Sequence, residues 1–164
     1  MLNLKEFHIG AVAYFNFDRP NGDADIAPTT ASTPARDRPH VLVQRCGGRS
    51  VWSPLTCRQR IGGERLFIER RWRRGGSDTF SLCDLFLQDG RNTFIGADRV
   101  FARASAPEFG FFSHPRPSIT RDGVRAIVAE IAYRGGTLLA GTEPGSSAAL
   151  SHSAARAEFL RSRD

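Results

Sequence analysis

Two apolar runs flank a pair of glycines in residues 38–56, which read Arg-Pro-His-Val-Leu-Val-Gln-Arg-Cys-Gly-Gly-Arg-Ser-Val-Trp-Ser-Pro-Leu-Thr. Short β-branched and aromatic runs bounded by turn formers are typical of strands. Residues 46–49 (Cys-Gly-Gly-Arg) supply the turn between them, so the segment predicts an antiparallel hairpin of strands 38–44 and 50–56. Pro54 has no N–H to donate, which places the end of the second strand at an edge or a bulge.

The same signals predict further short strands on both sides of the hairpin. They lie at residues 8–17, 65–72, 79–88, around 93–95 and at 100–102. Five to seven short strands at this spacing favour a small β-barrel or sandwich. Residues 18–37 are polar and rich in turn formers, so a long first loop is expected there, and loops of this length are often functional.

The pattern changes after residue 105 to that of a connector and a helix. Thr120 is suited to cap a helix whose apolar stripe, at helical spacing, is formed by Val124, Ile127, Val128, Ile131 and Ala132. The pair Gly135-Gly136 ends it. We therefore expect a mainly β (α+β) chain: a β-barrel domain over 1–105, a connector and a helix packed on it over 106–136, and a flexible tail or short helix over 137–164.

The basic residues are almost all arginine. The chain has 164 residues, 40% of them apolar, and a net charge of +6, values that exclude a coiled coil, a collagen-like chain and a fully disordered one. Of its 23 basic residues, 22 are Arg and one is Lys5. Arginine pairs bidentately with phosphate and stacks on flat rings, so this balance suggests a polyanionic partner. A GC-rich genome, which favours Arg codons, explains the same ratio.

The excess charge lies in residues 45–74. This window holds nine Arg against two Glu, a net charge of +7, so the rest of the chain carries −1. Aromatic residues are interleaved with the arginines, and a single-stranded nucleic-acid groove needs both cations and flat faces. The alternative is that the aromatic residues belong to the core and the arginines lie in water. On the first interpretation, the nucleic-acid-binding residues are Arg45, Arg49, Trp52, Arg58, Arg60, Arg70, Arg71, Trp72, Arg73 and Arg74.

The sequence contains no recognisable motif for a metal or a cofactor, so we expect neither a bound metal nor a cofactor. The four His are isolated, and the spacing of the three Cys matches no zinc or redox motif. Each Cys is expected to be a buried or half-buried small hydrophobic residue. There is no run of 18 apolar residues and no signal-peptide core in the first eight residues, so we expect a cytoplasmic chain with reduced thiols and no membrane partner.

Four short motifs occur in a suggestive order: Gly10-Ala-Val-Ala-Tyr-Phe, Arg38-Pro-His-Val-Leu-Val, Pro54-Leu-Thr, and Cys83-Asp-Leu-Phe-Leu-Gln-Asp-Gly-Arg91. This order resembles the MazF/PemK family of toxin–antitoxin ribonucleases over roughly residues 8–104. The resemblance implies an SH3-like barrel that forms a homodimer and cleaves single-stranded RNA as a metal-independent endoribonuclease. It also implies an antitoxin-like protein as a partner, with the groove for RNA or antitoxin across the subunit interface.

By this resemblance, Arg38 and Thr56 are the catalytic pair. Arg38 would assist proton transfer and stabilise the transition state, and Thr56 would position the scissile phosphate. The attacking group would be the 2′-hydroxyl of the RNA itself, which requires no metal motif. The residues alone predict only that these two lie near the same end of the hairpin, where an Arg beside a hydroxyl can clamp a phosphate. An ion pair of Arg38 with Asp37 or another surface carboxylate is the other interpretation.

Two further classes of function fit the sequence. One is a non-catalytic module that binds nucleic acid or protein through the arginine-rich segment. The other is a structural or assembly component of a phage or mobile element, in which that segment meets an acidic partner. Metal-independent cleavage of single-stranded RNA separates the enzyme from both.

Overall fold

The predicted hairpin is present as β3 (Pro39–Cys46) and β4 (Arg49–Thr56). The computed structural model describes residues 2–15, 27–28, 38–58, 65–105 and 116–140. Cys46 pairs with Arg49, so only two glycines form the turn, with φ angles of 57° and 75°. A two-residue turn with positive φ at both positions matches the twist of the flanking strands.

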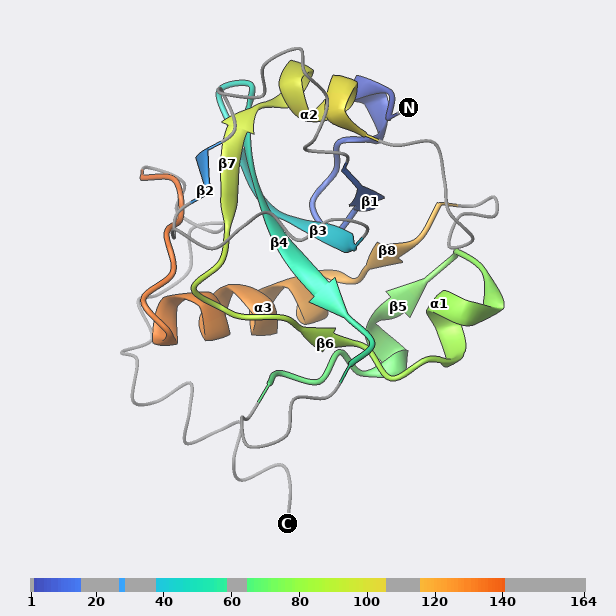
Figure 1. Ribbon diagram of the computed structural model, residues 1–164. Coiled ribbons are helices and arrows are strands. Elements are labelled where there is room, and N and C mark those ends of the chain that lie inside the picture. The colour runs from blue at the N-terminus through green and yellow to red at the C-terminus, as the bar shows by residue number, and fades with distance from the viewer. Residues whose placement is uncertain (1, 16–26, 29–37, 59–64, 106–115, 141–164) are drawn as a thin grey trace.

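The hairpin lies at the centre of an antiparallel sheet (Figure 1). The strand order is β1-β3-β4-β7-β2, where β1 is Val12–Tyr14, β7 is Phe94–Ala97 and β2 is Ala27–Pro28. The short strand β6 (Phe86–Leu87) pairs with the end of β4. The prediction of strands at 8–17 and 93–95 is confirmed in part, with β1 shorter and β7 longer than expected.

Pro54 lies inside β4, which has neighbours on both sides, so its predicted place at an edge or a bulge is wrong. The pairing of β4 with β7 ends at Trp52, and the pairing with β6 begins at Leu55. Pro54 falls between these two ladders, at a position where no ladder hydrogen bond would use its N–H, so proline is tolerated there. The bulge is instead in β3, after Leu42.

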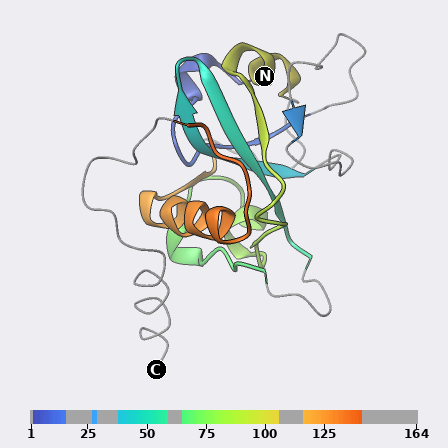
Figure 2. The ribbon, with the colours of Figure 1, turned by 90° about the vertical axis from the view of Figure 1, so that its left-hand side faces the viewer.

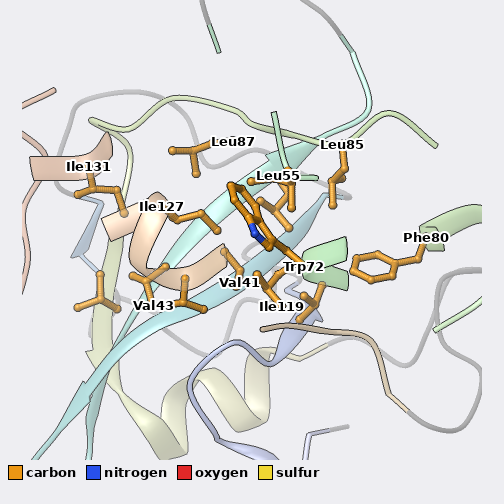
Figure 3. Close-up of a cluster of buried hydrophobic side chains, with 14 residues drawn as sticks. Val41, Val43, Leu55, Trp72, Phe80, Leu85, Leu87, Ile119, Ile127 and Ile131 are labelled. Carbon is orange, nitrogen blue, oxygen red and sulfur yellow. The ribbon is translucent and has the colours of Figure 1, made fainter. Parts of the chain in front are cut away.

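Both faces of the sheet are covered by apolar side chains. On one face, η1 (Leu4–Glu6) and α2 (Asp98–Ala104) lie together at one end of the molecule (Figure 1), over a cluster that includes Trp52 and Phe101. On the other face, α3 (Arg121–Tyr133) packs against β3 (Figure 2). Figure 3 shows that second cluster, with Trp72 between the helix and Phe80; its buried members are Val12, Val41, Val43, Val51, Leu55, Ile68, Trp72, Phe80, Leu85, Leu87, Ile119, Val124, Ile127 and Ile131.

The helix α3 confirms the sequence prediction except at Ala132, which is exposed rather than part of the buried stripe. Thr120 Oγ1 accepts a hydrogen bond from the Gly123 N–H at 3.5 Å and so caps the helix, and Ile127 and Ile131 on its stripe are fully buried. Gly135, with φ 73°, follows its C-terminus in the left-handed conformation that glycine favours there.

Three predicted strands are wrong. Residues 65–72 make one bridge, from Phe67 to Phe86, and end in the 3-10 turn η3 (Arg70–Trp72). Residues 79–88 begin in the short helix α1 (Asp78–Leu82) and reach sheet structure only at β6. Residues 100–102 lie in α2, whose inner side is formed by Val100, Phe101 and Ala104. Two further strands, β5 (Arg73–Arg74) and β8 (Ser118–Ile119), pair with each other.

The fold is therefore mainly β, an antiparallel sheet with a few helices. Among the described residues, the strand path does not close into a barrel. Most of the expected long loop at 18–37 and of the connector at 106–117, together with most of the expected tail at 137–164, lies outside the described residues. No described helix has the length and apolarity needed to cross a membrane.

Gly10 lies against the backbone of β8 at Ile119, whereas Gly47 has no close neighbour, so the same substitution at the two glycines tests how tightly the chain packs on β8. Both have positive φ, but a Cβ at Gly10 would overlap the Ile119 carbonyl oxygen, whereas one at Gly47 meets no atom within 4 Å. We expect Gly47→Ala to cost about 1–2 kcal/mol for the left-handed backbone alone. Gly10→Ala should cost more than about 3 kcal/mol, because overlap adds to strain. Urea unfolding of both variants measures this, and equal losses would contradict it.

Candidate nucleic-acid site

The register of the hairpin brings the predicted catalytic pair to the same end of the sheet. His40 pairs with Pro54 and Val41 with Ser53, and this register continued by two residues sets Arg38 opposite Thr56. Since side chains alternate along a strand, Arg38 and Thr56 belong to the same face as His40. Arg38 is half-buried and Thr56 is buried.

His40 holds the backbone of Arg38 through a hydrogen bond, a role that was not predicted from the sequence. Its Nδ1 donates to the Arg38 carbonyl at 2.9 Å, and its ring lies against Phe15 and Phe94, each 5.4 Å away between centroids. Burial lowers the pKa of His40 to about 4, partly offset by this hydrogen bond. The ring is therefore neutral at pH 7 and fixes the backbone at Arg38. The two-residue spacing from Arg38, on one face of a strand, was the available signal.

Thr56 begins a tight turn at the end of β4. Its Oγ1 accepts from the Arg58 N–H at 3.1 Å, and Arg65 Nη1 donates to the Arg58 carbonyl at 2.6 Å. A hydroxyl that accepts from a backbone N–H still has its own hydrogen to donate. Thr56 therefore keeps a hydrogen to donate, although its side chain is buried, and Arg58 is exposed beside it.

The arginine-rich segment does not form one surface. Arg45 and Arg49 flank the glycine turn, whereas Arg58 follows the opposite end of β4. At about 3.3 Å per residue, roughly 23 Å separates Arg49 from Thr56 along the strand. The predicted interface is thus divided between two ends of the hairpin, and only one end carries Arg38 and Thr56.

Arg45 has a structural partner at the turn end. Its Nε lies 2.7 Å from Asp98 Oδ2, its Nη1 donates to the Phe7 carbonyl at 2.9 Å, and its guanidinium lies 5.9 Å from the Phe7 ring centroid. Asp98 is buried in the first turn of α2. Arg45 therefore joins β3 to α2 and to the N-terminal segment.

Three predicted nucleic-acid-binding residues are buried. Trp52 is fully enclosed, and Trp72 is 8% exposed, so both belong to the cores, as the alternative interpretation of the aromatic residues held. Arg73 is also buried, and its guanidinium donates to the carbonyls of Ile68, Phe80 and Cys83. Burial lowers the pKa of Arg73 from its ordinary value. These side chains are removed from the candidate surface, and Arg60 lies outside the described residues.

The remaining arginines gather around η3. Arg70, Arg71 and Arg74 are exposed. Arg70 donates to the Leu82 carbonyl at 3.1 Å, and Arg71 pairs with Glu69 at 2.6 Å. The turn η3 lies against α3 rather than against the end of β4. Since η3 packs with α3 on the face of the sheet opposite His40, these three arginines are separate from the end of the hairpin that carries Arg38. The candidate site is therefore Arg38, Thr56 and Arg58.

Comparisons with other proteins identify no relative. No family model matches the chain, and neither the curated proteins nor the solved structures gave a significant match. Within the described part of the chain, no three His, Cys, Asp or Glu side chains gather as metal ligands would.

Arg45 and Arg49 give a matched test of the division between structural and surface arginines. We expect Arg45→Ala to lower the free energy of unfolding by about 1–3 kcal/mol, because Asp98 is left buried without this partner. Arg49→Ala, at an exposed position, should change it by less than about 0.5 kcal/mol. Chemical denaturation measures both, and an equal effect of the two variants would refute the assignment.

His40 makes the stability of the fold depend on pH. The ring takes up a proton near pH 6.5 when unfolded and near pH 4 when folded. Stability is therefore full above about pH 6.5 and falls by up to about 3 kcal/mol as the pH drops toward 4. His40→Phe should remove this part of the slope, while His8→Phe, at an exposed position, should keep it. Parallel pH profiles of the wild type and His40→Phe would count against this.

Proposed function

We propose that the chain is a MazF/PemK-like toxin, a metal-independent endoribonuclease that cleaves single-stranded RNA. The proposal includes the finer features of that family: an SH3-like barrel, a homodimer, a cytoplasmic location and an antitoxin-like protein partner. It extends the resemblance found in the sequence to the geometry at the end of the hairpin.

One observation carries the proposal: the hairpin register pairs His40 with Pro54 and, continued by two residues, sets Arg38 opposite Thr56. A guanidinium and a hydroxyl on one sheet face can hold two oxygens of the same phosphate. His40 restrains the backbone at Arg38, and the hydrogen bond from Arg58 to Thr56 restrains the hydroxyl. The site is thus held in place by its own neighbours, as electrostatic stabilisation of a transition state requires.

The chemistry uses the RNA as its own nucleophile. The 2′-hydroxyl attacks the adjacent phosphorus and gives its proton to water, a transfer that Arg38 assists. The 5′-oxygen of the next nucleotide leaves and takes up a proton from water. The product is a 2′,3′-cyclic phosphate. Arg38 stabilises the charge that develops on the phosphoryl oxygens, and Thr56 orients the phosphate. Arg58, exposed beside Thr56, attracts the RNA backbone next to the site.

Cleavage of end-labelled single-stranded RNA in EDTA tests the proposal. We expect the wild type to cut the RNA and to leave cyclic phosphate ends. Arg38→Ala should lower the rate about 10²- to 10³-fold, because it removes a cation from the developing charge. Thr56→Val, which keeps the shape but loses the hydroxyl, should lower it by about tenfold or more.

Arg49→Ala is the matched control, since it removes an exposed arginine of the same hairpin far from Thr56. Its rate should equal that of the wild type. RNA that stays intact with the wild type refutes the enzyme, and a salt-dependent gel shift without cleavage would favour the non-catalytic binding module instead. An equal loss in Arg38→Ala and Arg49→Ala would refute the assigned site.

A further inference from the structure

Cys57 and Cys83 are in contact, although 26 positions separate them in sequence. Cys57 Sγ donates a hydrogen bond to Cys83 Sγ at 3.2 Å. Cys57 directly follows β4 and is exposed, and so is Cys46, so the expectation of buried or half-buried cysteines is wrong for both. Cys83 caps the C-terminus of α1 and is half-buried. Cys57 and Cys83 are both free thiols. No motif spacing pointed to this pair, because the fold alone brings the end of β4 to the end of α1.

The surroundings of the pair hold both backbones in position. Arg73 Nη1 donates to the Cys83 carbonyl at 2.5 Å, and the hydrogen bond from Arg58 to Thr56 spans Cys57. Burial, and then the hydrogen bond to Cys83, raise the pKa of the Cys57 thiol to about 11. The reduced pair thus lacks the stabilised thiolate that makes some dithiols strongly oxidising. Since the thiolate is the attacking form, exchange at Cys57 is slow at neutral pH and becomes faster as the pH rises.

We propose that Cys57 and Cys83 are a redox modification site, which closes to an intramolecular disulfide by exchange with a low-molecular-weight disulfide. The thiolate of the exposed Cys57 attacks one sulfur of the small disulfide RSSR, and one RS⁻ leaves and takes up a proton. The thiolate of Cys83 then attacks the Cys57 sulfur of the mixed disulfide, and the second RS⁻ leaves. One RSSR is reduced to two RSH while the two thiols are oxidised.

The fold needs little change to reach the oxidised form. The sulfur atoms must approach from 3.2 Å to about 2.05 Å, a movement within the range of side-chain rotation. The new bond would close the loop between β4 and α1. Because loop closure restricts the unfolded chain, oxidation should raise the thermal midpoint by roughly 5–15 °C. None of this depends on the proposed ribonuclease activity.

Oxidation in graded mixtures of oxidised and reduced glutathione, followed by alkylation and mass spectrometry, tests the site. We expect the wild type to lose about 2 Da and two alkylatable thiols together, with a Cys57–Cys83 cross-linked peptide. Cys46→Ser, a matched variant at the far end of the hairpin, should behave identically. Cys57→Ser and Cys83→Ser should lose the cross-link and keep at most a glutathione adduct.

Three outcomes overturn the proposal. In the first, the wild type keeps three alkylatable thiols throughout the series. In the second, the wild type retains glutathione on Cys57 and Cys83 without forming the cross-link. In the third, the oxidised wild type has a lower thermal midpoint than the reduced protein. The wild-type measurements decide the question even if a serine variant fails to fold.

Discussion

The pairing of β3 with β4 is the contact on which the rest of the structure depends. The turn of Gly47 and Gly48 sets the register, and the bulge after Leu42 adjusts it before the strands reach the other end. Both faces of the hairpin are buried, so a slip by one residue would exchange the two cores. The same register, continued by two residues, sets Arg38 opposite Thr56. The packing of the two cores and the arrangement of the candidate site therefore both depend on this register.

The hairpin and α3 could be predicted because their signals are local. A glycine turn between apolar runs and an apolar stripe closed by a cap need no knowledge of distant contacts. The helix α1 could not, because its carbonyls are held by Arg73, which is itself placed by packing. In α2, the buried Asp98 meets Arg45 from β3, a contact between distant parts of the chain. Short elements of this kind are decided by tertiary contacts rather than by propensity.

The position of Arg38 and Thr56 at one end of the hairpin could be predicted from the sequence, whereas the exposure of the surrounding arginines could not. Arg38 and Thr56 follow from the hairpin and the family resemblance, whereas charge alone could not distinguish the buried Arg73 from the exposed Arg74 on the same strand. The interleaved tryptophans suggested stacking on bases, but they fill the two cores. His40 and the contact of Cys57 with Cys83 appear only when distant segments are brought together.

If the hairpin register places Arg38 and Thr56 on one phosphate, the two side chains act as a unit in cleavage. A double-mutant cycle of RNA cleavage in EDTA, with Arg38→Ala, Thr56→Val and the double variant, tests it most directly. We expect the double variant to be little slower than Arg38→Ala alone, since residues that act as a unit lose their effect together. Losses that multiply, as expected of independent positions, would contradict it.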